Sequence, residues 1–117
     1  MSIDNTRVAS ETTFLAAWRQ AVKLAGPQWF GDGADTDADS ADIWGLAPRV
    51  LDIEERLGML SHGEGVFLAT LVGFYNSWTG GDMWKLVEVR ALADVAAILD
   101  GPRRAAIAAL LISYAGW

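Results

Sequence analysis

Apolar residues recur at helical spacing along most of the chain. Phe14, Trp18 and Val22 lie four residues apart and predict a helix over residues 10–25 with one apolar face. Ser10 is suited to begin this helix because its hydroxyl can accept a hydrogen bond from a free amide of the first turn. The Gly-Pro pair at residues 26–27 predicts its end, since proline cannot continue a helix.

Residues 61–78 carry the clearest helix signal. Ser61 and Glu64 form the S-x-x-E pattern of a capping box ahead of a long apolar run. The apolar positions cover most of the helix circumference, as expected of a buried helix: Val66, Phe67, Leu68, Leu71, Val72, Phe74, Tyr75 and Trp78. We therefore predict a central buried helix near residues 62–78. Gly73 in its interior indicates that another helix crosses closely there.

Three further helices complete the predicted fold. Residues 48–60 and 102–117 each place apolar side chains at helical spacing, and in the last helix the predicted buried positions are Ile107, Leu110, Leu111 and Tyr114. Residues 79–82 (Thr-Gly-Gly-Asp) predict a break, after which residues 83–100 form one helix, with room for a kink. The prediction is an all-α, compact single-domain bundle of about five helices over residues 1–117, with a flexible amino terminus at residues 1–9 and an acidic loop at residues 31–42.

Charge is concentrated in one part of the chain. Residues 32–55 hold eight acidic residues and one arginine, a net charge of −7, whereas the rest sums to +1, with eight bases against seven acids. Within this region, residues 31–42 are rich in Asp, Gly and Ala, and repulsion between like charges favours an extended, solvated connector. An acidic region of this kind repels nucleic acid and attracts basic surfaces.

The aspartates of the loop also raise the possibility of a calcium site. Asp35, Asp37 and Asp39 match the first three ligand positions of an EF-hand loop. Ser40 stands where that loop has glycine, and Leu46 stands where it has a bidentate glutamate. The sequence therefore predicts no metal site, and a weak divalent-cation site on these three carboxylates is kept as an alternative.

Other chemistries find little support. The chain has no cysteine, and His62 is its one histidine, without a partner on the same helix face. Arg103 and Arg104 are the one basic doublet, too little for direct nucleic-acid binding. We expect no catalytic residue and no cofactor. The absence of an apolar stretch or leader of sufficient length favours a cytoplasmic protein without membrane contact.

The remaining candidate is a surface for a protein partner. Aromatic residues beside charges are typical of interface hot spots, and we assign partner binding to the acidic loop and its aromatic flanks: Asp32, Asp35, Asp37, Asp39, Asp42, Trp29, Phe30 and Trp44. The hypothesis is a non-enzymatic regulatory protein that docks on a basic protein of nucleic-acid-handling machinery, as phage-borne or mobile-element inhibitors of the anti-CRISPR-like type do.

Three other interpretations stay open. The tryptophans near helix breaks, Trp29, Trp44 and Trp117, could instead fill the ends of the bundle. They could also pair across a two-fold axis in a homodimer, which makes a self-associating structural protein the second alternative. A small-ligand pocket between helices near Gly73 and Tyr75 is the third.

Overall fold

Six α-helices make up most of the part of the chain that the structure describes. This computed structural model describes residues 3–117, with side chains from residue 11 onwards. The helices are α1 (Ile3–Ala25), α2 (Val50–Arg56), α3 (His62–Tyr75), α4 (Ser77–Leu86), α5 (Leu92–Ile98) and α6 (Gly101–Ser113). Short 3₁₀ turns lie in the connections from α1 to α2 and from α2 to α3. No β-strand occurs within residues 3–117. The all-α prediction is confirmed, with six helices in place of about five.

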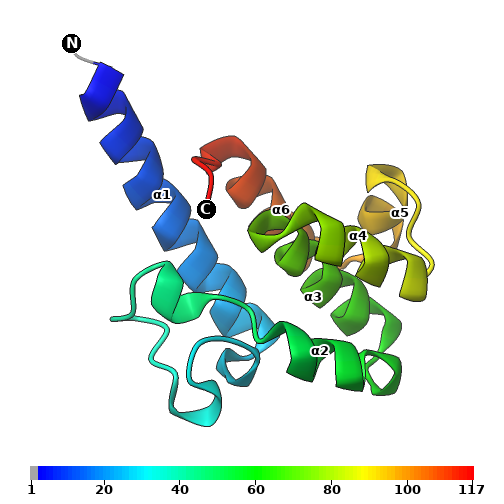
Figure 1. The fold of residues 1–117 in the computed structure, drawn as a ribbon. Helices are drawn as coiled ribbons and strands as arrows, with labels where there is room; N and C mark the ends of the chain where they lie inside the picture. The colour runs from blue at the N-terminus through cyan, green and yellow to red at the C-terminus, as the bar shows by residue number, and fades with distance from the viewer. Residues whose placement is uncertain (1–2) are drawn as a thin grey trace.

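Helix α1 runs along one side of the molecule, and its amino-terminal half extends beyond the other helices (Figure 1). The helix begins at Ile3, so the predicted start at Ser10 is wrong. The predicted flexible segment 1–9 falls partly outside the described residues, and residues 3–9 belong to α1. The helix ends at Ala25 as predicted, because Gly26 takes a φ of 113° that favours glycine and Pro27 follows it.

Helix α3 is the centre of the core, as predicted. Its residues 65–72 are all buried, and it packs against α4, α5 and α1. Ser61 caps it, since the hydroxyl accepts from the Glu64 amide at 3.2 Å and donates to the Glu64 carboxylate at 2.7 Å. Among residues 3–117, no helix has both the length and the apolar character that a bilayer crossing requires.

The end of α3 differs from the prediction. The helix stops at Tyr75, and the Asn76 side chain accepts from the Thr79 amide at 3.1 Å, which starts α4 at once. Residues 79–82 thus lie inside a helix, and the break predicted there is wrong. Trp78 moves from the predicted core helix to the outer side of α4, where it is 86% exposed.

The glycines of α3 and α4 serve close packing. A Cβ added at Gly80 would overlap the Cα and N atoms of Gly73, so the two helices touch backbone to backbone. The close crossing predicted at Gly73 is confirmed. The helix that crosses is the next one along the chain, because α3 and α4 form an antiparallel pair.

The segment 83–100, predicted as one helix, is divided between the end of α4 and α5. Between α4 and α5 the chain turns at Glu88, with a φ of 64°, and buries Val87 and Val89. The Val89 amide donates to the Trp84 carbonyl at 2.8 Å, and His62 Nε2 lies 2.9 Å from the Val87 carbonyl oxygen. These contacts form a turn at a place where the helical spacing of apolar residues predicted that the helix would continue.

Helix α6 begins as its sequence indicates, with the Asp100 carboxylate accepting from the Arg103 amide at 3.0 Å. Ile107 and Leu110 are buried as predicted. Leu111 and Tyr114, predicted to be buried, are each 53% exposed. Only part of the apolar face of α6 is therefore buried in the core.

The close contact of α3 with α4 predicts opposite effects at two neighbouring glycines. Gly80→Ala should lower the free energy of unfolding by about 1–3 kcal/mol, because its Cβ overlaps the backbone of Gly73. Gly81→Ala should raise it by about 0.5–1 kcal/mol, since the site has no neighbouring atom within 4 Å and alanine favours the helix. Urea denaturation followed by circular dichroism measures both, and equal effects would refute the close contact.

Candidate functional site

The acidic loop, residues 31–42, belongs to a segment whose two ends are joined. Phe30 and Pro48 form an isolated antiparallel bridge. The Gly31 amide donates to the Ala47 carbonyl at 2.9 Å, and the Arg49 amide donates to the Trp29 carbonyl at 2.8 Å. Residues 31–47 therefore form a loop whose two ends meet, and within it Ala38 and Leu46 are buried in the core.

Three side chains of α1 hold this segment against the helix. The Trp18 indole nitrogen donates to the Leu46 carbonyl at 2.9 Å within the core. The Arg19 guanidinium donates to the Ala41 carbonyl at 2.9 and 3.3 Å, and Lys23 forms an ion pair with Asp39. The expected extended connector is thus wrong, because the loop is folded back onto α1.

All five aspartates of the loop are exposed. Two of them also shape the loop by accepting hydrogen bonds within it. Asp37 accepts from the Asp39 amide at 3.0 Å and from the Ser40 hydroxyl at 2.7 Å, while Asp42 accepts from the Gly45 amide at 2.7 Å. Asp32 and Asp35 form neither a hydrogen bond nor an ion pair with the side chains described from residue 11 onwards. These two carboxylates are presented to solvent only.

The loop geometry changes the acidity of one carboxyl group. The hydrogen bond from the Ser40 hydroxyl, and then the one from the Asp39 amide, lower the pKa of Asp37 below 3.8. Both donors favour the ionised form. The ionised form of Asp37 is therefore part of the hydrogen-bonding of the loop.

The aromatic flanks of the loop separate into core and surface. Trp29 is 8% exposed and Phe30 is fully buried, with its ring centroid 5.9 Å from that of Trp18. These two predicted contact residues thus belong to the core. Of the three aromatic flanks, Trp44 alone is exposed, at 63%. Its ring is nearly perpendicular to that of Trp117, and the two ring centroids lie 6.3 Å apart. The interpretation that tryptophans close the end of the bundle holds for Trp29 and Trp117. The ring centroid of Trp117 lies 4.7 Å from that of Trp18.

A hollow of about 410 Å³ lies beside Trp44. It is bounded by α1 at Glu11 and Leu15, by the loop at Asp42, and by the carboxyl-terminal residues around Trp117. Among the side chains described from residue 11 onwards, the two charged ones that line it, Glu11 and Asp42, are acidic. Sequence reasoning missed Glu11 and Trp117, because only the packing of α1 and the chain end against the loop brings them there.

The loop carboxylates do not gather around a common point. No group of three or more His, Cys, Asp or Glu side chains in residues 11–117 is arranged to hold a metal ion. Asp37 is occupied by Ser40, and Asp39 is paired with Lys23. The alternative metal site on Asp35, Asp37 and Asp39 has no preformed geometry.

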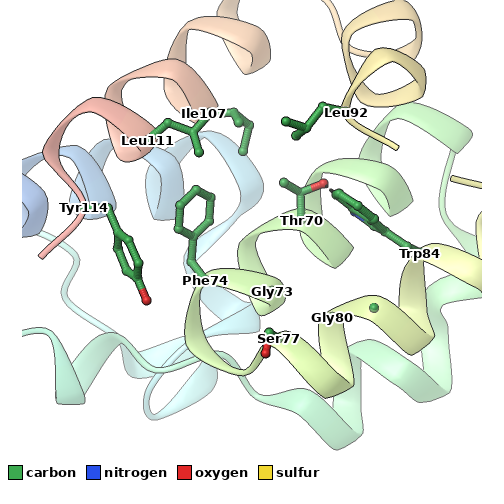
Figure 2. A pocket seen from close by; sticks show the side chains of 11 residues that line it. Thr70, Gly73, Phe74, Ser77, Gly80, Trp84, Leu92, Ile107, Leu111 and Tyr114 are labelled. Carbon is green, nitrogen blue, oxygen red and sulfur yellow. Dashed lines mark hydrogen bonds between the residues drawn. The ribbon is translucent and has the colours of Figure 1, made fainter. Parts of the chain in front are cut away.

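A second hollow, which we call the apolar groove, lies beside Gly73, where the sequence suggested a pocket, but Tyr75, the other residue suggested, does not line it. It has a volume of about 380 Å³ and runs between the α3–α4 pair and the α5–α6 pair, past Gly73 and Phe74 (Figure 2). Among residues 11–117, no charged residue lines it. At its floor the Trp84 indole donates to the Thr70 hydroxyl at 3.0 Å, which in turn donates to the Val66 carbonyl at 2.8 Å. These polar groups are already satisfied.

Comparisons of the chain with models of protein families, with curated proteins and with solved structures return no match. Two surfaces of distinct chemistry stand out within the described residues. One is the acidic face, which we define as the acidic loop with Trp44. The other is the uncharged apolar groove.

Loss of the Trp18 hydrogen bond should weaken the whole loop. Trp18→Phe leaves the Leu46 carbonyl buried without its donor, so the free energy of unfolding should fall by about 1–3 kcal/mol. Trp44→Phe, the same change at an exposed indole, should alter it by less than about 0.5 kcal/mol. Urea denaturation compares the two, and similar losses would contradict the role given to Trp18.

The pKa of Asp37 should depend on Ser40. In Ser40→Ala the largest stabilising contact of the carboxylate is lost, so the pKa should rise toward 3.8. Carbon-detected NMR titration of the carboxyl group measures it, with Ser77→Ala on α4 as the unaffected control. Because the pKa is lowered in the folded state, the contribution of Asp37 to stability is present above pH 3.8 and is lost as the pH falls through the folded-state value. An unchanged pKa in Ser40→Ala would contradict the assigned cause.

Proposed function

We propose that this protein is a non-enzymatic interaction protein whose acidic face docks on a basic surface of a protein partner. The observation that carries the proposal is the way the loop is held. Five exposed carboxylates lie on a segment that α1 fixes through Trp18, Arg19 and Lys23. A surface that is ordered before binding avoids much of the entropic cost of ordering a flexible acidic segment.

The charge of this face favours a basic partner. Lys23 is the one basic side chain paired with the carboxylates of the loop among residues 11–117, and it engages Asp39. The Arg49 guanidinium donates to the Gly31 carbonyl at 3.2 Å and forms an ion pair with Asp52 at 2.8 Å. Arg49 therefore forms no ion pair with a carboxylate of the loop. Such a field accelerates association with basic surfaces and disfavours acidic ones, nucleic acid included.

The hollow beside Trp44 adds a feature that charge alone lacks. Two carboxylates, Asp42 and Glu11, and two indoles, Trp44 and Trp117, border it. An arginine of the partner can stack on an indole while its guanidinium bonds to a carboxylate. We therefore place the centre of the interface at Trp44 and the electrostatic rim along the acidic loop.

Proteins that bind nucleic acid present lysines and arginines to phosphates, and the same side chains would accept the carboxylates of this face. This chemistry supports a regulator or inhibitor of nucleic-acid-handling machinery, of the phage or mobile-element type and anti-CRISPR-like. The proposal assigns no catalytic group and no cofactor. A cytoplasmic location also stays a prediction.

Removal of charge from the acidic face should weaken capture of the partner. Asp32→Asn/Asp35→Asn deletes two carboxylates without a structural contact, so its affinity for a captured basic protein should fall about two- to thirtyfold. Binding of the unmodified protein should weaken further as salt is raised, because exposed charges are screened. Quantitative mass spectrometry of proteins captured from a cell lysate identifies the partner, and titration calorimetry measures its affinity.

The matched control is Asp82→Asn/Glu88→Gln, which removes two exposed charges outside residues 32–55 and should leave affinity unchanged. Capture that is insensitive to salt and equal for both double variants would refute the proposal.

A further inference from the structure

The apolar groove combines an empty recess with apolar side chains that face solvent. Figure 2 shows Ile107 and Leu111 of α6, and Tyr114 directly after it, across from Phe74 of α3, with Leu92 of α5 and Trp84 of α4 at the other end. Three of the lining side chains are largely open to solvent, since Leu92 is 59% exposed and Leu111 and Tyr114 are each 53% exposed. The four helices thus meet without covering these residues.

Trp78 stands at the edge of this groove. Its neighbour Ser77 lines the groove, and so does Gly81 one turn further along α4. Trp78 is directed away from the core and is 86% exposed, the highest value of any tryptophan from residue 11 onwards. A large apolar side chain and an apolar recess therefore lie side by side on one surface.

We propose that this surface binds a second copy of the chain, with Trp78 of each copy inserted into the apolar groove of the other. Two copies related by a two-fold axis each present the same patch, so the interface must be complementary to itself. A projecting tryptophan next to a recess meets this requirement, because each copy supplies one of each. The glycine at position 81 leaves room for the approach, since no atom lies within 4 Å of a Cβ there.

Charge also favours a second copy at this face. The chain carries a net charge of −6, so two copies repel each other wherever their acidic residues meet. The described lining of the groove has no charged residue, and on the nearby turn of α4 the Asp82 carboxylate forms an ion pair with Lys85, with 4.0 Å between Oδ1 and Nζ. The acidic loop packs against α1, whereas the groove is built from α3 to α6, so it is a face on which copies can associate without bringing the loops together.

The exposed apolar area fits a weak dimer. Burial of Trp78, Tyr114, Leu92 and Leu111 would remove on the order of 400 Å² per copy from water. That is about half of the roughly 800 Å² that each partner contributes to a standard interface. The proposed dimer therefore belongs to the transient class and should form at high micromolar concentration.

Sedimentation velocity of the full chain from about 10 µM to 1 mM tests this inference. The unmodified protein should shift from monomer to dimer over this range, with a dissociation constant that reports the contact. Trp78→Ala removes the inserted side chain and Gly81→Leu fills the recess, and each should weaken the dimer at least tenfold. Circular dichroism should show that both variants keep the helical fold, because Trp78 is exposed and Gly81 has open space around it.

Two variants serve as matched controls. Trp44→Ala removes an exposed tryptophan on the acidic face, and Gly58→Leu adds a leucine at another glycine with no atom within 4 Å of its Cβ. Both should dimerise as the unmodified protein does. This test is independent of the acidic face, so a failed dimer leaves the proposed partner binding untouched.

Three results would overturn the inference. The first is a monomer throughout the concentration range. The second is a dimer that either Trp78→Ala or Gly81→Leu leaves unaffected. The third is a monomer that binds 8-anilinonaphthalene-1-sulfonate and loses this binding in Gly81→Leu, since the groove would then hold a small apolar molecule and not a second copy.

Discussion

The hydrogen bond from the Trp18 indole to the Leu46 carbonyl is the contact on which the rest of the structure depends. It joins residues 28 positions apart in the chain and is buried in the core. The same indole ring packs against Phe30 at 5.9 Å and against Trp117 at 4.7 Å. One side chain of α1 thus organises the start of the loop, its return and the end of the chain. A buried carbonyl that lost its donor would carry the full cost of desolvation, so this site specifies a single arrangement.

The acidic face follows from that contact. Once Leu46 is held at α1, the chain between residues 31 and 47 has to run over the surface, and Arg19 and Lys23 direct its path. The aspartates remain in water because burial of five like charges would be prohibitive. The core is one cluster to which α1, the loop and helices α2 to α6 all contribute, and helices α3 to α6 also line the apolar groove. The fold therefore separates a charged surface from an apolar one, and this separation supports two different binding events.

Local signals in the sequence predicted much of the fold. The four-residue spacing of Phe14, Trp18 and Val22, the cap at Ser61 and the interior Gly73 each report an interaction between near neighbours or a simple steric need. The all-α class follows from them.

Features that depend on distant contacts were not predictable in this way. Trp29 and Phe30 look like surface aromatics beside acids, and only the Phe30–Pro48 bridge places them inside. Trp78 fits the period of α3, yet Asn76 begins a new helix and turns it outward. The hollow at Trp44 and the apolar groove are each formed by residues of several elements. Their residues can be named from the sequence, but which of them come together depends on how the elements pack.

Native-state hydrogen exchange at the base of the loop tests the central claim most directly. The Gly31 and Arg49 amides donate to Ala47 and Trp29, and their bonds persist only while the loop is held to α1. NMR-detected exchange should show both amides protected to a degree similar to the buried amides of α3, such as that of Leu68. Exchange of Gly31 and Arg49 at the rate of an unstructured peptide, with α3 still protected, would show that the loop is not held and would contradict the account.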